Sequence, residues 1–371
     1  MSIASSQNSL TIEKNEGHGH DWGLILSALS ILVVGLFSLT SIDADRNTNF
    51  ASRQMIFAAI GIGVFYFFNK IKLEVFRTAT PALYIINVLL LISTILFGKS
   101  RGETSRWIDL GPFQFQPSEV SKLLLAITLA AYFANREEKL TDLSTFLGAL
   151  LHAAPILALI LLQPHLGATM ALVFLVLTVA ITAGTPWKFF PVTIAAIAAL
   201  AIGSYYTGVM PAYMRARVDA KVQQYVHKKK DHKNEDFQQY QSMLAFGSGG
   251  TTGTGFFRGE QKASGIIPEQ ESDFIFSVIG EEGGFFGSTL VVGLFSVFFF
   301  FVWRRVYMAQ TVMGRLTATG VFAVLAFHTI VSLAMVLGFG PVVGLWLPFM
   351  SHGGTALWMC FGAIGLLDQC E

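Results

Sequence analysis

The sequence predicts an all-α polytopic membrane protein with about ten transmembrane helices and one long polar loop. Two observations support this prediction. The 371 residues are 53% hydrophobic and only 13% charged, whereas a soluble domain carries about 25% charged residues. The mean hydropathy is +0.56, and the apolar residues fall in runs long enough to cross a bilayer as helices. Most of the chain is therefore expected to lie in lipid.

Ten apolar runs are predicted to form the spanning helices. The run at 118–134 is the weakest of them because it contains Glu119 and Lys122. The predicted spans are residues 22–41, 53–69, 79–98, 118–134, 146–163, 167–184, 188–206, 274–303, 316–339 and 352–368.

The N-terminal tail, residues 1–21, is polar, and the apolar run that begins at Trp22 is long enough to span. We expect a retained anchor there, since no cleavable signal is evident. Cys360 and Cys370 lie near the other end of the chain, and two such cysteines do not indicate a disulfide framework. The net charge of +1 does not indicate a nucleic acid partner.

Lysine and arginine in short loops predict the orientation, because these residues collect on the cytoplasmic side. With both termini inside, ten of them lie on the cytoplasmic side and five on the opposite side. The ten are Lys14, Lys70, Lys72, Arg77, Arg136, Lys139, Lys188, Arg304, Arg305 and Arg315. The five are Arg46, Arg53, Lys99, Arg101 and Arg106. The predicted organisation is a cytoplasmic tail at 1–21 and a transmembrane domain at 22–371.

The one long polar segment, residues 207–272, is expected to be a large extracytoplasmic loop between the seventh and eighth spans. It contains a charged stretch that could include a surface helix, followed by the glycine-rich "FGSGGTTGTGFFRGEQ" at 246–261. That run lacks the Gly-Lys-Ser/Thr of a phosphate-binding loop, so a tightly turning loop is the simpler interpretation. Arg258 gives it one cation.

Charged side chains inside spans are rare and are hypotheses for functional sites by default. Glu119 and Lys122 stand at i and i+3 on one helix face, where they can pair. They could form a self-satisfied ion pair that holds the helices together, or the floor of a polar cavity that contacts an anionic ligand. Both interpretations remain open.

The stretch "GETSRWIDLGPFQFQPSEVSKL" at 102–123 contains an Arg106–Trp107 pair. Trp107 could be an ordinary interface aromatic, or it could line a groove in which Arg106 binds phosphate. Four histidines in or beside spans are expected to form hydrogen bonds between helices, and their spacing does not predict a zinc site. They are His152, His165, His328 and His352.

Asp273 differs from the other acids of "PEQESDFIFSVIGEEGGFFG" (268–287) by its position. It lies where the exterior loop meets the eighth span, so its carboxylate is expected to be partly desolvated and still open to the exterior. Desolvation raises the pKa of a carboxylate toward the range of a general base. Asp273 could also serve as a helix N-cap. Glu269 and Glu271 frame it, whereas Glu281 and Glu282 are expected to stabilise the bundle through hydrogen bonds.

At these motifs the chain resembles the SEDS family (shape, elongation, division and sporulation), the group of RodA and FtsW. The resemblance covers nearly everything after residue 20, and the motifs occur in the family's order. The matching stretches are "RWIDLGPFQFQPSEVSKL" (106–123), "LQPHLGATM" (162–170), "GSGGTTGTGFFRGEQ" (247–261), "PEQESDFIFSVIGEEGGFFG" (268–287) and "GFGPVVGLWLPFMSHGGTAL" (338–357).

The resemblance implies ten transmembrane helices with both ends in the cytoplasm of a bacterium. It implies a peptidoglycan glycosyltransferase that polymerises lipid II on the outer face of the cytoplasmic membrane, together with a class B penicillin-binding protein. The length, the short tail and "RWIDLG" favour the RodA branch, which serves elongation and shape. The family's catalytic aspartate falls on Asp273, its motif tryptophan on Trp107, and its intramembrane acid and base on Glu119 and Lys122.

Four positions depart from the usual family pattern: His165 replaces an aspartate, Gly283 a leucine, Ser332 an asparagine and His352 a tyrosine. His165 matters most, because the missing acid would stand near the Glu119–Lys122 pair. His165 either substitutes as a hydrogen-bond acceptor or marks an altered site.

The implied reaction starts from an α-linked pyrophosphate and gives a β-1,4-linked glycan, so a single inverting displacement with Asp273 as general base is expected. Positive charge on the pyrophosphate could come from Arg106, Arg258, Lys122 or a divalent cation such as Mg²⁺ or Mn²⁺. Glu269 and His165 complete the predicted substrate-binding set. Two alternatives remain open: an inactive or altered scaffold member of a cell-wall complex, and a lipid-linked precursor flippase or transporter.

Overall fold

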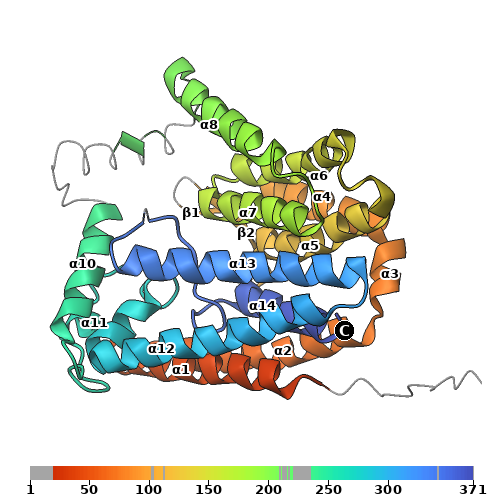
Figure 1. Cartoon of the computed structure of the whole chain (residues 1–371). Helices are drawn as coiled ribbons and strands as arrows, with labels where there is room; N and C mark the ends of the chain where they lie inside the picture. Colours follow the sequence, from red (N-terminus) through yellow and green to blue (C-terminus); the bar gives the residue numbers. More distant parts are fainter. Residues whose placement is uncertain are drawn as a thin grey trace, which may run out of the picture.

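The computed structural model describes residues 20–101, 104–111, 113–208, 210, 215, 218–219, 235–340 and 342–370. Helices make up nearly all of the part that it describes (Figure 1). The predicted N-terminal tail up to residue 19 and most of the charged stretch at 220–234 lie outside the described residues.

Each predicted span contains a helix. The ten helices are α1 Trp22–Arg46, α2 Phe50–Lys70, α4 Thr80–Phe97, α5 Pro117–Ala134, α6 Leu143–Leu162, α7 Leu166–Thr182, α8 Phe189–Thr207, α12 Ile275–Met308, α13 Val312–Val336 and α14 Gly354–Asp368. The connections hold α3 Leu73–Thr78, the 3-10 helix η1 Glu137–Lys139, α10 Glu235–Ser248 and α11 Glu260–Ala263.

Seven of the described helices are long and apolar enough to cross a membrane: α1, α2, α4, α6, α8, α12 and α13. The apolar helices α7 and α14 are shorter, with 17 and 15 residues. Helix α5 has 18 residues and includes Glu119 and Lys122. The number of ten crossings therefore stays a prediction.

Helix α5 lies at the centre of the bundle. Sixteen of its 18 residues are buried, as expected for a helix that is surrounded on all sides. It packs against α4, α6, α7, α13 and α14. The contact with α13 is close, because a Cβ added at Gly320 would lie 2.8 Å from the Cβ of Ala126. Helices α1, α12 and α13 run alongside one another, and α8 projects away from the rest (Figure 1).

Buried charges tie α1, α12 and α14 together at the end of the bundle near the C-terminus. Asp21 is the N-cap of α1, as its oxygen accepts a hydrogen bond from the backbone N–H of Leu24. The Arg305 Nε lies 2.9 Å from Asp21 Oδ2, and its NH2 lies 3.3 Å from Asp368 Oδ1. Arg305 is thus a buried structural cation rather than a free loop charge.

A small antiparallel sheet precedes α5 and departs from the all-α prediction. It consists of β1 Lys99–Arg101, β2 Thr104–Asp109 and β3 Gln114–Phe115, with β2 between the other two. Ile108 pairs with Phe115 in its register. Strands of three, six and two residues are too short to show an alternating apolar pattern, so the sequence did not indicate them. The sheet matters because β2 carries Arg106 and Trp107.

Helix α12 is interrupted at Gly284, whose φ of 60° and ψ of −154° are not helical. The glycine-rich loop packs against this break. The backbone N–H of Phe285 donates to the Gly250 carbonyl at 2.9 Å, and that of Phe286 donates to Thr251 at 3.2 Å. A Cβ added at Gly253 would lie 2.0 Å from the Glu282 carbonyl oxygen. The glycines are needed here because two backbones approach each other closely.

Candidate functional site

Asp273 lies in a turn directly before α12. The carbonyl of Glu269 accepts hydrogen bonds from the backbone N–H groups of Asp273 at 2.9 Å and Ser272 at 3.2 Å. Glu269 has a φ of 51°, in the left-handed region. The N-cap position of α12 is occupied by Phe274, and no side chain caps the helix. Asp273 is therefore not the N-cap residue of this helix.

The carboxylate of Asp273 faces the segment that joins α13 to α14. A Cβ added at Gly344 would lie 3.2 Å from Asp273 Oδ2. Two further hydrogen bonds tie this segment to the turn: Ser351 Oγ donates to the Ser272 carbonyl at 2.5 Å, and the backbone N–H of His352 donates to the Glu271 carbonyl at 2.9 Å. The segment 342–348 thus forms one wall of the Asp273 site.

Burial raises the pKa of Asp273 to about 7, and the negative charge of Glu269 contributes to the rise. The Ser272 hydroxyl and the positive charge of Arg106 act in the opposite direction on this pKa. The residue is only partly buried by its surface area, so solvent or a ligand can reach it. A carboxyl group with a pKa near 7 is suited to accept a proton at neutral pH.

Arg106 connects the sheet to the turn between α6 and α7. Its Nε donates to the Gln163 carbonyl at 3.2 Å, and its NH2 donates to the Pro164 carbonyl. Trp107 is the next residue on β2 and is partly exposed. Arg106 is thereby held beside His165, and its charge acts on Asp273.

Glu119 and Lys122 form an ion pair inside the bundle. Lys122 Nζ lies 2.8 Å and 2.9 Å from the two Glu119 carboxylate oxygens. The side chains are 1% and 0% exposed. A third partner, His328 Nε2 on α13, lies 2.9 Å from Lys122 Nζ. The sequence indicated the pair but not this histidine, because Lys122 and His328 are 206 positions apart.

His165 lies against the first turn of α5. Its Nδ1 is 3.3 Å from Ser118 Oγ and 3.4 Å from Gln116 Nε2, and the residue is 4% exposed. Ser118 directly precedes Glu119, so His165 lies at the same end of α5 as the ion pair. The hydrogen bonds also match the expectation of a histidine that joins helices.

The other three departures from the family pattern lie in different surroundings. The ring of His352 packs edge-on against Phe50, with ring centroids 5.0 Å apart. Ser332 is 1% exposed on α13. A Cβ added at Gly283 would meet no atom within 4 Å, so a larger residue is not excluded there by crowding.

Arg258 does not join the other candidates. It is exposed in the glycine-rich turn, its backbone N–H donates to the Gly255 carbonyl at 3.2 Å, and it forms no ion pair with a described residue. The structure thus supports the turning-loop interpretation of this motif. It does not place Arg258 with Asp273.

Glu281 and Glu282 stabilise the bundle through hydrogen bonds, as predicted from the sequence. Glu281 accepts hydrogen bonds from the backbone N–H groups of Gln261 at 2.7 Å and Lys262 at 3.0 Å. Glu282 Oε1 lies 2.6 Å from the Lys262 ammonium, which also donates to Ser41 Oγ on α1 at 2.5 Å. Lys262 was not singled out from the sequence, since nothing in its local pattern shows that it is buried.

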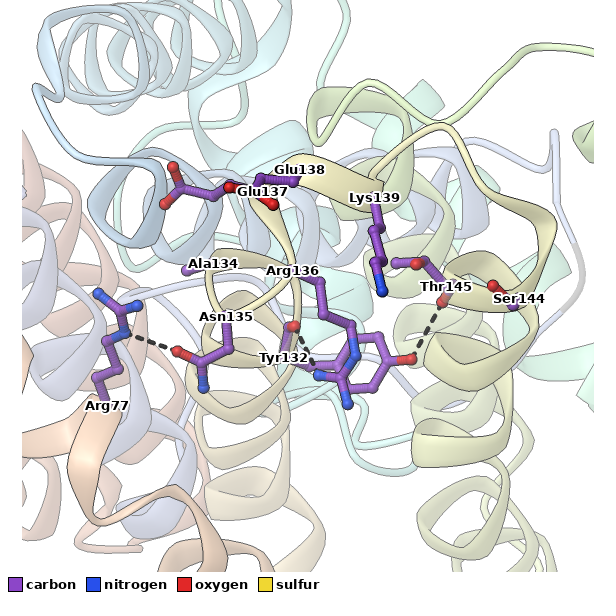
Figure 2. A pocket seen from close by; sticks show the side chains of 10 residues that line it. All are labelled: Arg77, Tyr132, Ala134, Asn135, Arg136, Glu137, Glu138, Lys139, Ser144 and Thr145. Atoms are coloured by element: carbon purple, nitrogen blue, oxygen red, sulfur yellow. Dashed lines mark hydrogen bonds between the residues drawn. The ribbon is translucent and has the colours of Figure 1, made fainter.

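No group of three or more His, Cys, Asp and Glu side chains within the described ranges is placed to hold a metal ion. A hollow of about 620 Å³ lies at the far end of α5, where Arg77, Tyr132, Arg136 and Lys139 line it (Figure 2). It is well separated from His165 and Arg106 at the start of α5.

Several apolar helices around a buried ion pair, with a carboxylate at one end of the bundle, define a multi-pass membrane protein with a polar site. The family profile of the cell cycle proteins FtsW, RodA and SpoVE matches residues 21–371. This chain belongs to that family.

Individual relatives support the assignment over nearly the full length. The probable peptidoglycan glycosyltransferase FtsW of Trichlorobacter lovleyi is 33% identical over 352 residues, 93% of this chain and 90% of the relative. The peptidoglycan glycosyltransferase MrdB of Escherichia coli is 30% identical over 348 residues, 93% of this chain and 91% of the relative.

A solved structure shows the same fold. It comes from work on the structural coordination of polymerization and crosslinking by a peptidoglycan synthase complex. One chain of it matches with a TM-score of 0.82 and 26% identity, over 95% of this chain and 97% of that chain. The membrane fold predicted from the sequence is thus confirmed.

Proposed function

We propose that this protein polymerises lipid II into peptidoglycan glycan strands by inverting glycosyl transfer at the outer face of the cytoplasmic membrane. The observation that carries the proposal is the Asp273 carboxyl group, which has a pKa of about 7, is not used as a helix cap and faces Gly344. The FtsW and MrdB relatives, which are named as peptidoglycan glycosyltransferases, support the reaction class.

The proposed reaction is a single displacement. The Asp273 carboxylate takes the proton of the acceptor 4-hydroxyl as its oxygen attacks the anomeric carbon of the donor. The bond from that carbon to the α-linked phosphate oxygen breaks, and the lipid pyrophosphate leaves with the electron pair. Attack from the opposite face turns the α-linkage into a β-1,4-linkage. Positioned proton transfer of this kind typically contributes about 10²- to 10⁴-fold in rate.

Arg106 is the best-supported cation for the leaving pyrophosphate, because its charge acts on Asp273 and guanidinium groups bind phosphate oxygens in pairs. Lys122 is fully buried, and its ammonium already contacts Glu119 and His328. We therefore assign Lys122 and Glu119 to the internal support of the site. Trp107, His165 and Glu269 are proposed to line the substrate-binding groove, and Arg258 to act outside it.

We further propose that both termini lie in the cytoplasm of a bacterium, with residues 207–272 outside. A class B penicillin-binding protein is the expected partner, and the related chain from a synthase complex supports an assembly of this kind. A role in elongation and cell shape stays a prediction, because relatives named FtsW and MrdB match this chain almost equally well.

The decisive experiment is polymerisation of purified lipid II by the wild-type protein and by Asp273→Asn, with the penicillin-binding partner present. Asparagine keeps the shape of the side chain but cannot take the proton, so the rate should fall by at least about 10²-fold. Gel electrophoresis of the glycan products measures the rate, with and without added Mg²⁺ or Mn²⁺.

Glu260→Gln is the matched control, since Glu260 is an exposed carboxylate on α11 near the same end of the bundle. It should retain wild-type activity. Normal polymer from Asp273→Asn would refute the base assignment. A wild-type protein that binds its partner without making polymer would favour the scaffold alternative, and lipid translocation without polymer would favour the transporter.

A further inference from the structure

His328 has two polar contacts, one from each ring nitrogen. Its Nε2 lies 2.9 Å from the Lys122 ammonium, and its Nδ1 lies 3.3 Å from the Trp346 carbonyl oxygen. The ring also packs against the Trp346 indole at a tilt of 38°, with centroids 4.2 Å apart. Lys122 and His328 are both 0% exposed, so solvent does not replace these contacts.

Hydrogen-bond chemistry fixes the tautomer of this ring. An ammonium group has three donors and no acceptor, so the Nε2 that faces Lys122 must be the acceptor. A carbonyl oxygen only accepts, so the Nδ1 that faces Trp346 must carry the proton. His328 is therefore a neutral Nδ1–H imidazole that links Lys122 to the backbone at position 346.

The backbone at position 346 belongs to the wall of the Asp273 site. Two residues earlier, Gly344 faces the Asp273 carboxylate, because a Cβ added there would lie 3.2 Å from Asp273 Oδ2. Val343 is adjacent to α7, since a Cβ added at Gly167 would lie 2.7 Å from the Val343 carbonyl oxygen. On the other side, Leu347 N–H donates to Ser351 Oγ at 2.8 Å. The segment 342–348 is thus held from several directions, and His328 connects it to the ion pair on α5.

We propose that His328 is a positioning residue that holds the segment 342–348 against Asp273 by joining the Glu119–Lys122 pair to the Trp346 carbonyl. This inference rests on the proposed role of Asp273. A displacement of about 1 Å at a reacting group can cost about 10²-fold in rate even when the change lies away from the chemistry. Losing the His328 link is expected to act in this way, on kcat rather than on substrate binding.

Kinetics of three variants test the proposal. His328→Phe keeps a planar ring of similar size but loses both nitrogens, and kcat should fall by about 10- to 100-fold with the KM for lipid II within about twofold. His328→Gln keeps one acceptor and one donor and should stay within about fivefold of wild type. His152→Phe is the matched control. His152 on α6 places its Nε2 3.1 Å from Thr128 Oγ1 on α5, and it does not contact the segment 342–348.

Three kinetic outcomes would overturn the proposal: full activity in His328→Phe, an equal loss in His152→Phe, or no difference between His328→Gln and His328→Phe. If His328→Phe fails to insert or fold, the tautomer still decides the matter. Nitrogen-15 NMR of the protein with its eight histidines labelled reports which ring nitrogen of each histidine carries the proton. The signal that disappears in His328→Gln is that of His328.

The expected signal is that of a neutral ring protonated at Nδ1, and Lys122→Met should change it by removing the donor to Nε2. A ring protonated at Nε2, or at both nitrogens, would overturn the proposal. The NMR measurement needs no substrate. An inactive wild-type protein would refute the proposed function but would leave the NMR result for His328 unchanged. A His328 ring protonated at Nε2 would refute the link between Lys122 and the Trp346 carbonyl but would leave the assignment of Asp273 as the base intact.

Discussion

At the scale of single residues, the protonation of Asp273 should control the pH dependence of the reaction. Its pKa of about 7 exceeds the ordinary value because of burial and the Glu269 charge. A general base acts only when deprotonated, so activity should rise with pH through about 7 and fall roughly tenfold for each unit below it. Initial rates of glycan formation between about pH 5 and about pH 9 measure this limb.

The two charges that act on Asp273 should move this limb in opposite directions. Glu269→Gln removes a negative charge, so the pKa of Asp273 should fall and the limb should move to lower pH. Arg106→Gln removes a positive charge, so the pKa should rise and the limb should move to higher pH. Glu260→Gln serves again as the control without a shift. A limb that stays in place in both variants would show that another group controls the rate.

At the scale of elements, the break in α12 depends on one backbone position. Gly284 has φ and ψ values that residues with a Cβ essentially do not adopt. A Cβ there would also lie 2.3 Å from the backbone nitrogen of Gly253. The break lets the two parts of α12 accept the glycine-rich loop while the Glu282–Lys262 pair joins that loop to α1.

Gly284→Ala should destabilise the protein by about 1–3 kcal/mol or more, through backbone strain and the clash with the loop. Gly293→Ala is the matched control on the same helix, because a Cβ there meets no atom within 4 Å and alanine favours a helix by about 1 kcal/mol. Thermal unfolding in detergent compares the two. Equal midpoints for both variants would mean that the Gly284 conformation is not required.

At the scale of the whole molecule, the predicted topology places the Asp273 end outside and the far end of α5 inside. Ser264 is exposed beside α11, and Ser144 is exposed beside the hollow that contains Arg136 and Lys139. In intact cells, a membrane-impermeant thiol reagent should label Ser264→Cys and not Ser144→Cys. Background labelling should be low because the native Cys360 and Cys370 are buried. Labelling of Ser144→Cys and not of Ser264→Cys would show that the orientation is the reverse of the predicted one.

The sequence predicted the helices well because their signal is local. The hydropathy of each apolar run is enough to predict a helix there. The predicted and observed helix boundaries agree within a few residues, as at the start of α1 (Trp22) and of α5 (Pro117). The i and i+3 spacing of Glu119 and Lys122 likewise lies within one helix and predicted the pair that is observed. The sheet at 99–115 was missed because its strands are too short for a pattern.

The sequence by itself determined the membrane class, the positions of the helices and the candidate base, because hydropathy and motif order are properties of the chain. Only the tertiary structure decided which distant residues meet. His328 reaches Lys122, Lys262 reaches Ser41 and Glu282, and Gly344 lies against Asp273. These contacts depend on how helices pack, and a buried polar group is stabilised only by the partner that packing brings to it.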